Sequence, residues 1–164
     1  MYLYLVQHGA AKREEEDHSR PLSSQGLLDI TRVASYISKL DIRVDDIIFS
    51  TKLRARQTAE VICEYLKPMK GISEKDGLSP LENPAIWKER LTGLSDNLFL
   101  VGHLPHLARL SSLLLCGDAE KNIITFQMAG VVCLKRNESG IWSLQWMITP
   151  QTIVGETAGS CDSL

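Results

Sequence analysis

Five consecutive apolar or aromatic residues occupy positions 2–6, directly after the initial methionine. Such a run, with two aromatic residues and a β-branched one, predicts a strand that is buried on both faces. His8 and Gly9 follow, and a glycine there allows the backbone to turn sharply. Because open α/β sheets bind ligands beyond the carboxyl ends of their strands, His8 stands where a ligand would be expected. For this stretch alone, the simpler interpretation is an ordinary strand end with an incidental histidine.

Helical periodicity follows in two stretches, residues 27–40 and 52–66, where apolar residues recur three and four positions apart. Ser23 or Ser24 is the expected N-cap of the first helix, and Ser50–Thr51 supplies that of the second. The positions expected to form the apolar stripes are Leu27, Ile30, Val33, Ala34, Ile37 and Leu40 in the first helix, and Leu53, Ala59, Val61, Ile62 and Tyr65 in the second.

Strands alternate with helices along the rest of the chain. Further strands are predicted over residues 44–49, 71–74, 97–101, 130–136 and 141–148, and further helices over residues 84–91 and 107–116. The last two strands are joined by the turn sequence 137–140. This order predicts an α/β fold with a mostly parallel central sheet, helices on both faces and a C-terminal antiparallel hairpin. Residues 1–150 form one domain, and residues 151–164 are expected to be a polar, disordered tail.

The overall composition excludes several classes of protein. A net charge of -2 gives no general attraction to nucleic acid or membranes. The N-terminus has no signal-peptide pattern, and no apolar run approaches the ~20 residues of a membrane span. The four cysteines lack any C-x-x-C pair, which disfavours a zinc site or a disulfide framework and fits a reducing cytoplasm. We expect a cytoplasmic monomer without metal or other cofactor.

The second predicted helix carries three cations, Lys52, Arg54 and Arg56, in its first two turns. Cations there oppose the helix dipole, so their position needs a reason. Arg56 is expected to face solvent or to pair with Glu60, four residues on. Arg20 precedes Pro21, which restrains it to an extended conformation.

Three predicted strand ends can converge, because parallel strands end on the same side of a sheet. They carry His8, the segment 50–56 and His103. Two histidines with two arginines form a site suited to a dianion. A neutral imidazole can attack phosphorus, guanidinium groups bind phosphoryl oxygens bidentately, and a protonated second histidine can stabilise the transferring group.

Four short motifs in this order resemble the histidine phosphatase superfamily. They are H-G after the first strand, R-P-L-S-x-x-G from Arg20, S-x-x-L-R-A-x-Q-T from Ser50 and G-H-L-P from Gly102. The short chain is most similar to phosphohistidine phosphatases of the SixA type. The resemblance covers residues 1–150 and implies a phosphoglycerate mutase-like fold. It further implies that His8 is the nucleophile that becomes phosphorylated, and that Arg54, His103 and Arg20 bind the phosphoryl group.

One departure from the family pattern concerns the first motif, R-H-G, in which Gln7 replaces the arginine. Glutamine can still bind a phosphate by hydrogen bonds but brings no charge. Loss of a charged donor to a transition state slows a reaction roughly 10²- to 10³-fold. A phosphate- or phosphoprotein-binding module with little or no turnover is therefore the alternative to a phosphatase.

The substrate class depends on whether the site has a general acid. Esters of alcohols need one for the leaving alkoxide, but Leu104, rather than an acid, follows His103. The nearby candidates are Glu74, Asp76 and Glu82, in a segment too short for a substantial lid. A labile phosphohistidine and an open site favour a phosphorylated protein as substrate; a small-molecule phosphoesterase that uses Glu82 is the other possibility.

Two further groups of residues are weaker candidates for a functional site. His103 and His106 could suggest a metal pair, but Pro105 between them and the lack of carboxylates argue against it. His106 is expected to be structural or to lie on the rim of the site. The tryptophans have no accompanying basic stripe, so packing is favoured over binding of nucleic acid.

Overall fold

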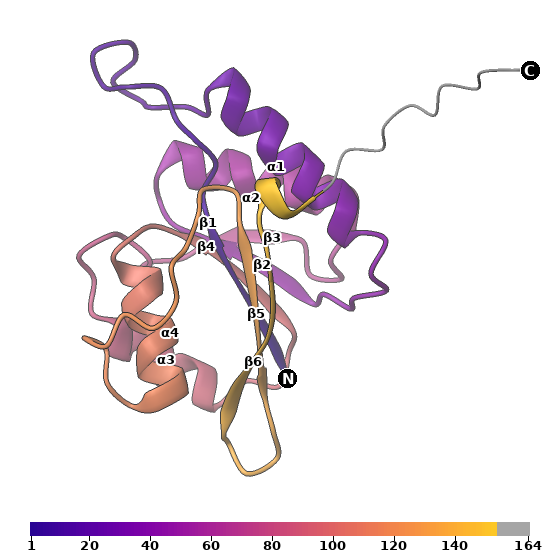
Figure 1. Ribbon diagram of the computed structural model, residues 1–164, viewed down its shortest axis with the longest axis vertical. Coiled ribbons are helices and arrows are strands. Elements are labelled where there is room, and N and C mark those ends of the chain that lie inside the picture. Colours follow the sequence, from indigo (N-terminus) through magenta and orange to yellow (C-terminus); the bar gives the residue numbers. More distant parts are fainter. Residues whose placement is uncertain (154–164) are drawn as a thin grey trace, which may run out of the picture.

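The computed structural model describes residues 1–153. A single six-stranded sheet runs through its centre in the order β3-β2-β4-β1-β5-β6 (Figure 1). Strands β3, β2, β4 and β1 are parallel, whereas β5 and β6 are antiparallel to their neighbours. The strands are β1 (Tyr2–Gln7), β2 (Asp46–Phe49), β3 (Ile72–Glu74), β4 (Leu98–Gly102), β5 (Val131–Arg136) and β6 (Trp142–Ile148). The mostly parallel sheet with a C-terminal hairpin is confirmed.

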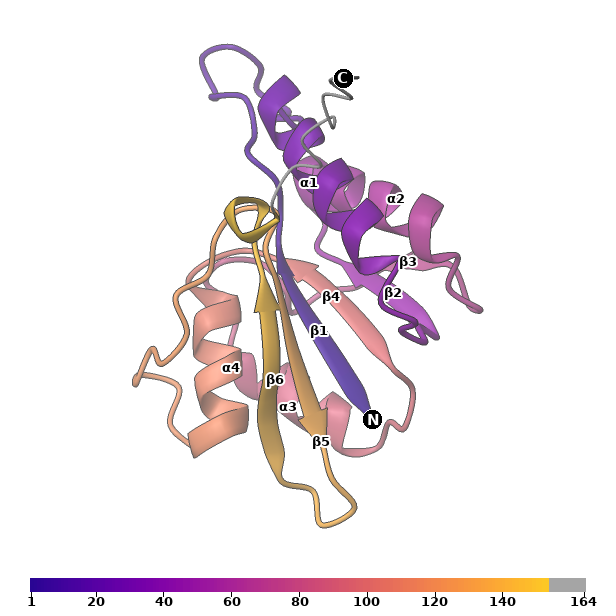
Figure 2. The same ribbon diagram turned by 45° about the vertical axis from the view of Figure 1, so that its right-hand side comes forward.

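Helices cover both faces of the sheet (Figure 2). α1 (Ser24–Ile37) and α2 (Leu53–Leu66) pack on one face, and α3 (Pro84–Thr92) and α4 (His106–Cys116) on the other. The hydrophobic core accordingly has two halves. In β1, Tyr4 and Val6 belong to the half under α1 and α2, while Leu3 and Leu5 belong to the half under α3 and α4. β1 is thus buried on both faces, as its unbroken apolar run predicts.

The apolar stripes of α1 and α2 are narrower than predicted. Ile30, Val33, Ala34 and Ile37 are buried in α1, but Leu27 is 50% exposed, because Gly26 takes the inward position of the first turn. Leu40 lies beyond the end of α1 and is exposed. In α2 the buried positions are Ala55, Thr58, Ala59 and Ile62, whereas Leu53 and Val61 are half-buried and Tyr65 is exposed. Small inward residues let α2 lie close to the sheet.

The N-cap predicted for α1 is confirmed, whereas the prediction of the N-cap of α2 is wrong. The Ser23 hydroxyl accepts a hydrogen bond from the Gly26 N–H at the start of α1. α2 begins after Lys52, whose side chain makes no capping bond, although Ser50–Thr51 was expected to supply the cap. The Ser50 side chain instead contacts His103.

The C-terminal part of the described chain folds back onto α1. Pro150–Thr152 form a short 3-10 helix that packs against α1, and the Arg32 guanidinium donates to the Ile153 carbonyl oxygen at 2.8 Å. Gln151 and Thr152 therefore belong to the folded domain rather than to the predicted tail, which was expected to begin at residue 151. The remainder of that tail, residues 154–164, lies outside the described residues. None of the helices within residues 1–153 is long and apolar enough to cross a membrane.

Candidate active site

The side chains of three predicted site residues meet at the carboxyl end of the parallel strands. His8 directly follows β1, His103 directly follows β4, and Arg54 lies in the first turn of α2. The Arg54 Nε–H donates to Nε2 of His8 at 3.1 Å. The two imidazole rings lie 4.9 Å apart between centroids, and both side chains are buried. The predicted convergence of these strand ends is confirmed.

His8 is held in one orientation by the turn that follows it. Its Nδ1 lies 2.7 Å from the Gly9 carbonyl oxygen. Because a carbonyl only accepts hydrogen bonds, Nδ1 carries the ring proton and the lone pair is on Nε2. The pKa of His8 is lowered to about 4, chiefly by burial and also by the Arg54 and Arg20 charges, against the opposing effect of the Gly9 carbonyl. His8 is therefore a neutral imidazole at pH 7.

His103 is also a neutral imidazole, whereas the role expected from the sequence is that of a protonated histidine during phosphoryl transfer. Burial lowers its pKa to about 3, and the nearby His8, Arg54, Lys52 and His106 act in the same direction. Its Nε2 lies 2.9 Å from the Ser50 hydroxyl. Its Nδ1 is buried and has no hydrogen-bond partner within residues 1–153.

Arg20 lies near the site but in a different backbone conformation from the one expected. Its φ is 48°, in the left-handed region, although a residue before proline was expected to be extended. A local hydrogen bond from the Arg20 N–H to the Asp17 carbonyl oxygen, at 2.9 Å, closes the preceding turn and accompanies this conformation. The Arg20 charge lowers the pKa of both His8 and Arg54, so Arg20 lies close enough to act on them electrostatically.

Gln7 is the last residue of β1 and is 7% exposed. Since neighbouring side chains of a strand point to opposite faces, Gln7 lies on the α4 side of the sheet and His8 on the α2 side. Its side-chain oxygen Oε1 is buried and has no hydrogen-bond partner within the described chain. The position that carries a charged arginine in the family motif therefore holds a neutral, incompletely bonded amide.

Two motif residues, Gln57 and Thr58, received no role from the sequence but tie the site loops to α2. The Thr58 hydroxyl accepts from the Gly9 N–H at 3.1 Å and donates to the Arg54 carbonyl oxygen at 2.7 Å. The Gln57 Oε1 accepts from the Leu22 N–H at 2.7 Å. The only signal for them in the sequence was their place in the S-x-x-L-R-A-x-Q-T motif. Arg56, in contrast, pairs with Glu60 at 2.8 Å, as predicted.

The glycine of the R-P-L-S-x-x-G motif allows the loop after β1 to approach α1. A Cβ atom on Gly26 would overlap the carbonyl oxygen of Ala10. The Ser23 N–H also donates to that oxygen, at 2.8 Å. The motif thus fixes the path of the chain that leaves His8 and Gly9.

The three carboxylates predicted as candidate general acids differ in their surroundings. The carboxylate of Asp76 pairs with Arg90 at 2.7 Å, and Glu74 ends the edge strand β3 with an exposed side chain. Glu82 lines a cavity of about 500 Å³ together with Lys52, whose charge lowers the pKa of His103. Of the three carboxylates, Glu82 alone lines a cavity with a residue that influences the pKa of His103.

His106, the first residue of α4, is fully buried rather than on the rim. Neither of its ring nitrogens has a hydrogen-bond partner within residues 1–153. Burial lowers its pKa to about 4. We refer to His8, His103 and His106 as the buried histidines. Within the described part of the chain, no cluster of three or more histidine, cysteine or acidic residues could hold a metal ion.

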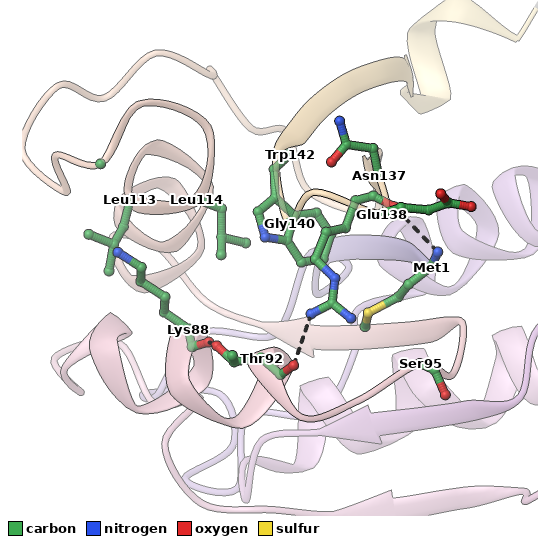
Figure 3. A pocket seen from close by; sticks show the side chains of 12 residues that line it. Met1, Lys88, Thr92, Ser95, Leu113, Leu114, Asn137, Glu138, Gly140 and Trp142 are labelled. Atoms are coloured by element: carbon green, nitrogen blue, oxygen red, sulfur yellow. Dashed lines mark hydrogen bonds between the residues drawn. The ribbon is translucent and has the colours of Figure 1, made fainter.

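A cavity of about 650 Å³ lies away from the buried histidines (Figure 3). Residues of α3, α4 and the β5–β6 hairpin line it, among them Lys88, Leu113 and Trp142. The Arg136 guanidinium at this cavity donates to the Leu91 carbonyl oxygen. Since Met1 also lines it, this cavity lies at the amino end of β1, opposite the end that carries His8.

Comparison with known proteins identifies the family. The model of the histidine phosphatase superfamily (branch 1) matches residues 3–82. An uncharacterized protein of Picosynechococcus sp. is 30% identical over 150 residues, which cover 86% of this chain and 88% of that protein. The chain belongs to the histidine phosphatase superfamily. A second member, phosphohistidine phosphatase SixA of Escherichia coli, is 24% identical over 92% of this chain and 94% of its own length.

Solved structures of other phosphatases share the fold. The protein histidine phosphatase SixA complexed with tungstate matches with a TM-score of 0.81 at 22% identity, over 92% of this chain and 98% of that one. The α-ribazole phosphatase of Shigella flexneri matches with a TM-score of 0.75 at 14% identity, over 92% and 97%. The superfamily fold is therefore present throughout, and membership supports a phosphatase. These structures are named for different substrates, so the fold alone does not identify the substrate of this protein.

Proposed function

We propose that this protein removes the phosphoryl group from phosphohistidine on another protein through a covalent phospho-His8 intermediate. The observation that carries the proposal is the state of His8. The ring is neutral, the Gly9 carbonyl holds the proton on Nδ1, and the lone pair on Nε2 faces the Arg54 guanidinium. A neutral imidazole with a fixed lone pair is a competent nucleophile toward phosphorus.

In the first step, the Nε2 lone pair of His8 forms a bond to phosphorus while the P–N bond of the substrate breaks. The electron pair of that bond returns to the substrate imidazole, which leaves as a neutral ring if its other nitrogen already carries a proton. No external proton is required, since one imidazole replaces another. In the second step water attacks phosphorus, the electron pair of the N–P bond returns to Nε2, and dihydrogen phosphate leaves with both protons of the water.

The charges around the histidines support this exchange over ester hydrolysis. The charged side chains that lower the pKa of His8 and His103 are Arg54, Arg20 and Lys52, all cations. Cations stabilise the charge of the transferring phosphoryl group. Hydrolysis of an alkyl ester would in addition require a general acid that protonates the leaving alkoxide. Glu82 is the candidate for that acid among the residues around the site.

The rim of the site supports a protein rather than a small substrate. Three large apolar side chains are exposed there, Leu81 at 87%, Met128 at 49% and Leu104 at 37%. Leu104 adjoins His103, and Leu81 shares the cavity with Lys52. Met128 precedes Ala129, whose N–H donates to the Gln7 carbonyl oxygen at 3.0 Å. Apolar side chains around a phosphate site are suited to the surface of a protein partner.

The test is direct detection of the intermediate. Protein exposed to phosphoramidate is denatured at alkaline pH, which preserves N–P bonds, and the phosphorylated residue is located by mass spectrometry. We expect phosphate on His8, none in His8→Ala, and normal labelling in the control His18→Ala, which removes an exposed histidine outside the site. Labelling that persists in His8→Ala would overturn the proposed intermediate.

The substrate is tested separately by comparing kcat/KM for a phosphohistidine-bearing protein with kcat/KM for an alkyl phosphate. We expect the phosphohistidine substrate to be favoured. Preference for the alkyl phosphate, lost in Glu82→Gln, would establish the small-molecule phosphoesterase instead.

A binding module with little turnover is the second candidate, and the uncharged Gln7 favours it. Such a module would bind vanadate tightly but form phospho-His8 slowly or not at all. Vanadate affinity and the rate of His8 labelling, measured on the same preparation, separate this candidate from the phosphatase.

A further inference from the structure

Ser50 has a sequence position typical of a helix cap but a side chain turned to a different partner. It lies between β2 and α2, and it makes no capping bond to α2. Its Oγ lies 2.9 Å from Nε2 of His103. Both residues are almost completely inaccessible, with 1% and 2% of their surface exposed. The Ser50 hydroxyl therefore contacts a candidate catalytic side chain instead of capping α2.

The direction of this hydrogen bond decides which buried proton is left unpaired. A serine hydroxyl has one proton to donate, and within residues 1–153 the Ser50 side chain has no hydrogen bond other than the one to His103. If Nε2 of His103 donated its proton, the buried hydroxyl proton would have no acceptor within residues 1–153, and if the hydroxyl donates, the buried Nδ1 proton has none. Only in the second case is the unpaired donor on the histidine ring, where a phosphoryl oxygen of the proposed substrate can accept it, so the Ser50 hydroxyl is assigned as the donor and Nε2 as the acceptor.

The proton of the neutral His103 ring must then be on Nδ1, because a neutral imidazole carries one proton. Nδ1 is also the ring atom that is buried without a partner in the described structure. We propose that Ser50 is a positioning residue that holds His103 in the Nδ1–H tautomer, so that the ring offers an N–H donor rather than a lone pair to a phosphoryl oxygen. Both the acceptor and the choice of tautomer rest on the proposed function.

The tautomer matters because the two forms act oppositely on an anion. A lone pair at Nδ1 would repel a phosphoryl oxygen, whereas an N–H would bind it, most strongly as charge develops during transfer. Loss of the Ser50 hydroxyl would allow the proton to move to Nε2. Turnover would then require a tautomer that is populated only part of the time, and kcat would fall more than KM would rise.

The tautomer can be measured without any turnover. Protein labelled with ¹⁵N in histidine is analysed at pH 7 by two-bond ¹H–¹⁵N correlation, which distinguishes protonated from unprotonated ring nitrogens. We expect His103 to be protonated on Nδ1 in the wild type and in Ser50→Thr, and to show a mixed or reversed pattern in Ser50→Ala. Protonation on Nε2 in the wild type would overturn the inference, even if Ser50→Ala failed to fold.

Kinetics provide the second readout. Ser50→Ala should lower kcat on phosphoramidate roughly 10-fold, the effect of one neutral hydrogen bond, and Ser50→Thr should restore most of it. The matched control is Ser111→Ala, which removes another fully buried serine, one whose hydroxyl donates within α4 to the Ala108 carbonyl oxygen. Unchanged kcat and tautomer in Ser50→Ala would refute the inference. An inactive wild type with the expected tautomer would instead refute the proposed function.

Discussion

Replacement of Arg54 by alanine tests the proposed phosphate site most directly. Its guanidinium contacts His8, the proposed nucleophile, at 3.1 Å, and it is the largest cationic influence on the His8 pKa. A hydrogen bond to a charged group contributes about 1.5–3 kcal/mol. At ~1.4 kcal/mol per decade, Arg54→Ala should weaken binding of vanadate or phosphate roughly 10- to 150-fold.

The same substitution should change the pH dependence of activity in a defined direction. Burial and then the Arg54 and Arg20 charges keep the pKa of His8 low, at about 4. Without Arg54, protonation of His8 becomes easier and its pKa rises. The nucleophile is active when neutral, so the acid limb of kcat/KM, which reports the free enzyme, should move to higher pH.

Arg56→Ala is the matched control, because Arg56 lies two residues along the same helix but pairs with Glu60 at the surface. Vanadate affinity is measured by isothermal titration calorimetry, and kcat/KM is followed from pH 4 to 8 with phosphoramidate. Arg56→Ala should leave both unchanged. If Arg54→Ala matched Arg56→Ala in affinity and acid limb, Arg54 would not belong to the phosphate site.

Three further predictions follow from the neighbourhood of the site. Gln7→Arg should raise kcat/KM on phosphoramidate roughly 10- to 100-fold by adding a charged donor; unchanged kinetics would show that position 7 does not touch the phosphate. Gly26→Ala should cost about 1–3 kcal/mol through overlap with the Ala10 backbone, detected as a lower Tm, whereas Gly93→Ala, whose Cβ would meet no neighbour within 4 Å, should not. Lowered folded-state pKa values of the buried histidines mean that stability is full above pH ~6.5 and is lost progressively as the pH falls toward ~4; urea unfolding that is flat across this window would contradict it.

The fold and the meeting of three site residues could be predicted because they depend on periodic and topological rules. An unbroken apolar run fixes β1 as a central strand, and parallel strands bring the ends that carry His8 and His103 to the same side of the sheet. The motif spacing adds Arg54. These features repeat along the chain or follow from the order of the elements, so each is visible without coordinates.

The remaining features depend on contacts between distant residues. Ser50 has the chemistry of a helix cap, and only its proximity to His103, 53 residues away, reveals the other use of its hydroxyl. The positive φ of Arg20 accompanies a hydrogen bond to Asp17 that local propensity does not predict. The neutral state of His103 follows from burial, and burial is a property of the packed molecule.

The charged side chains that lower the pKa values of the buried histidines are cations. Binding of an anion at this site should therefore be coupled to the binding of protons. Each imidazole has a low pKa because it is buried beside cations. A phosphate dianion held by Arg54 would offset those cations and raise the imidazole pKa values, so its binding would draw protons from the buffer. Inorganic phosphate, the product of the proposed reaction, should therefore exchange protons with the buffer when it binds. The heat of its binding should vary with the ionisation enthalpy of the buffer.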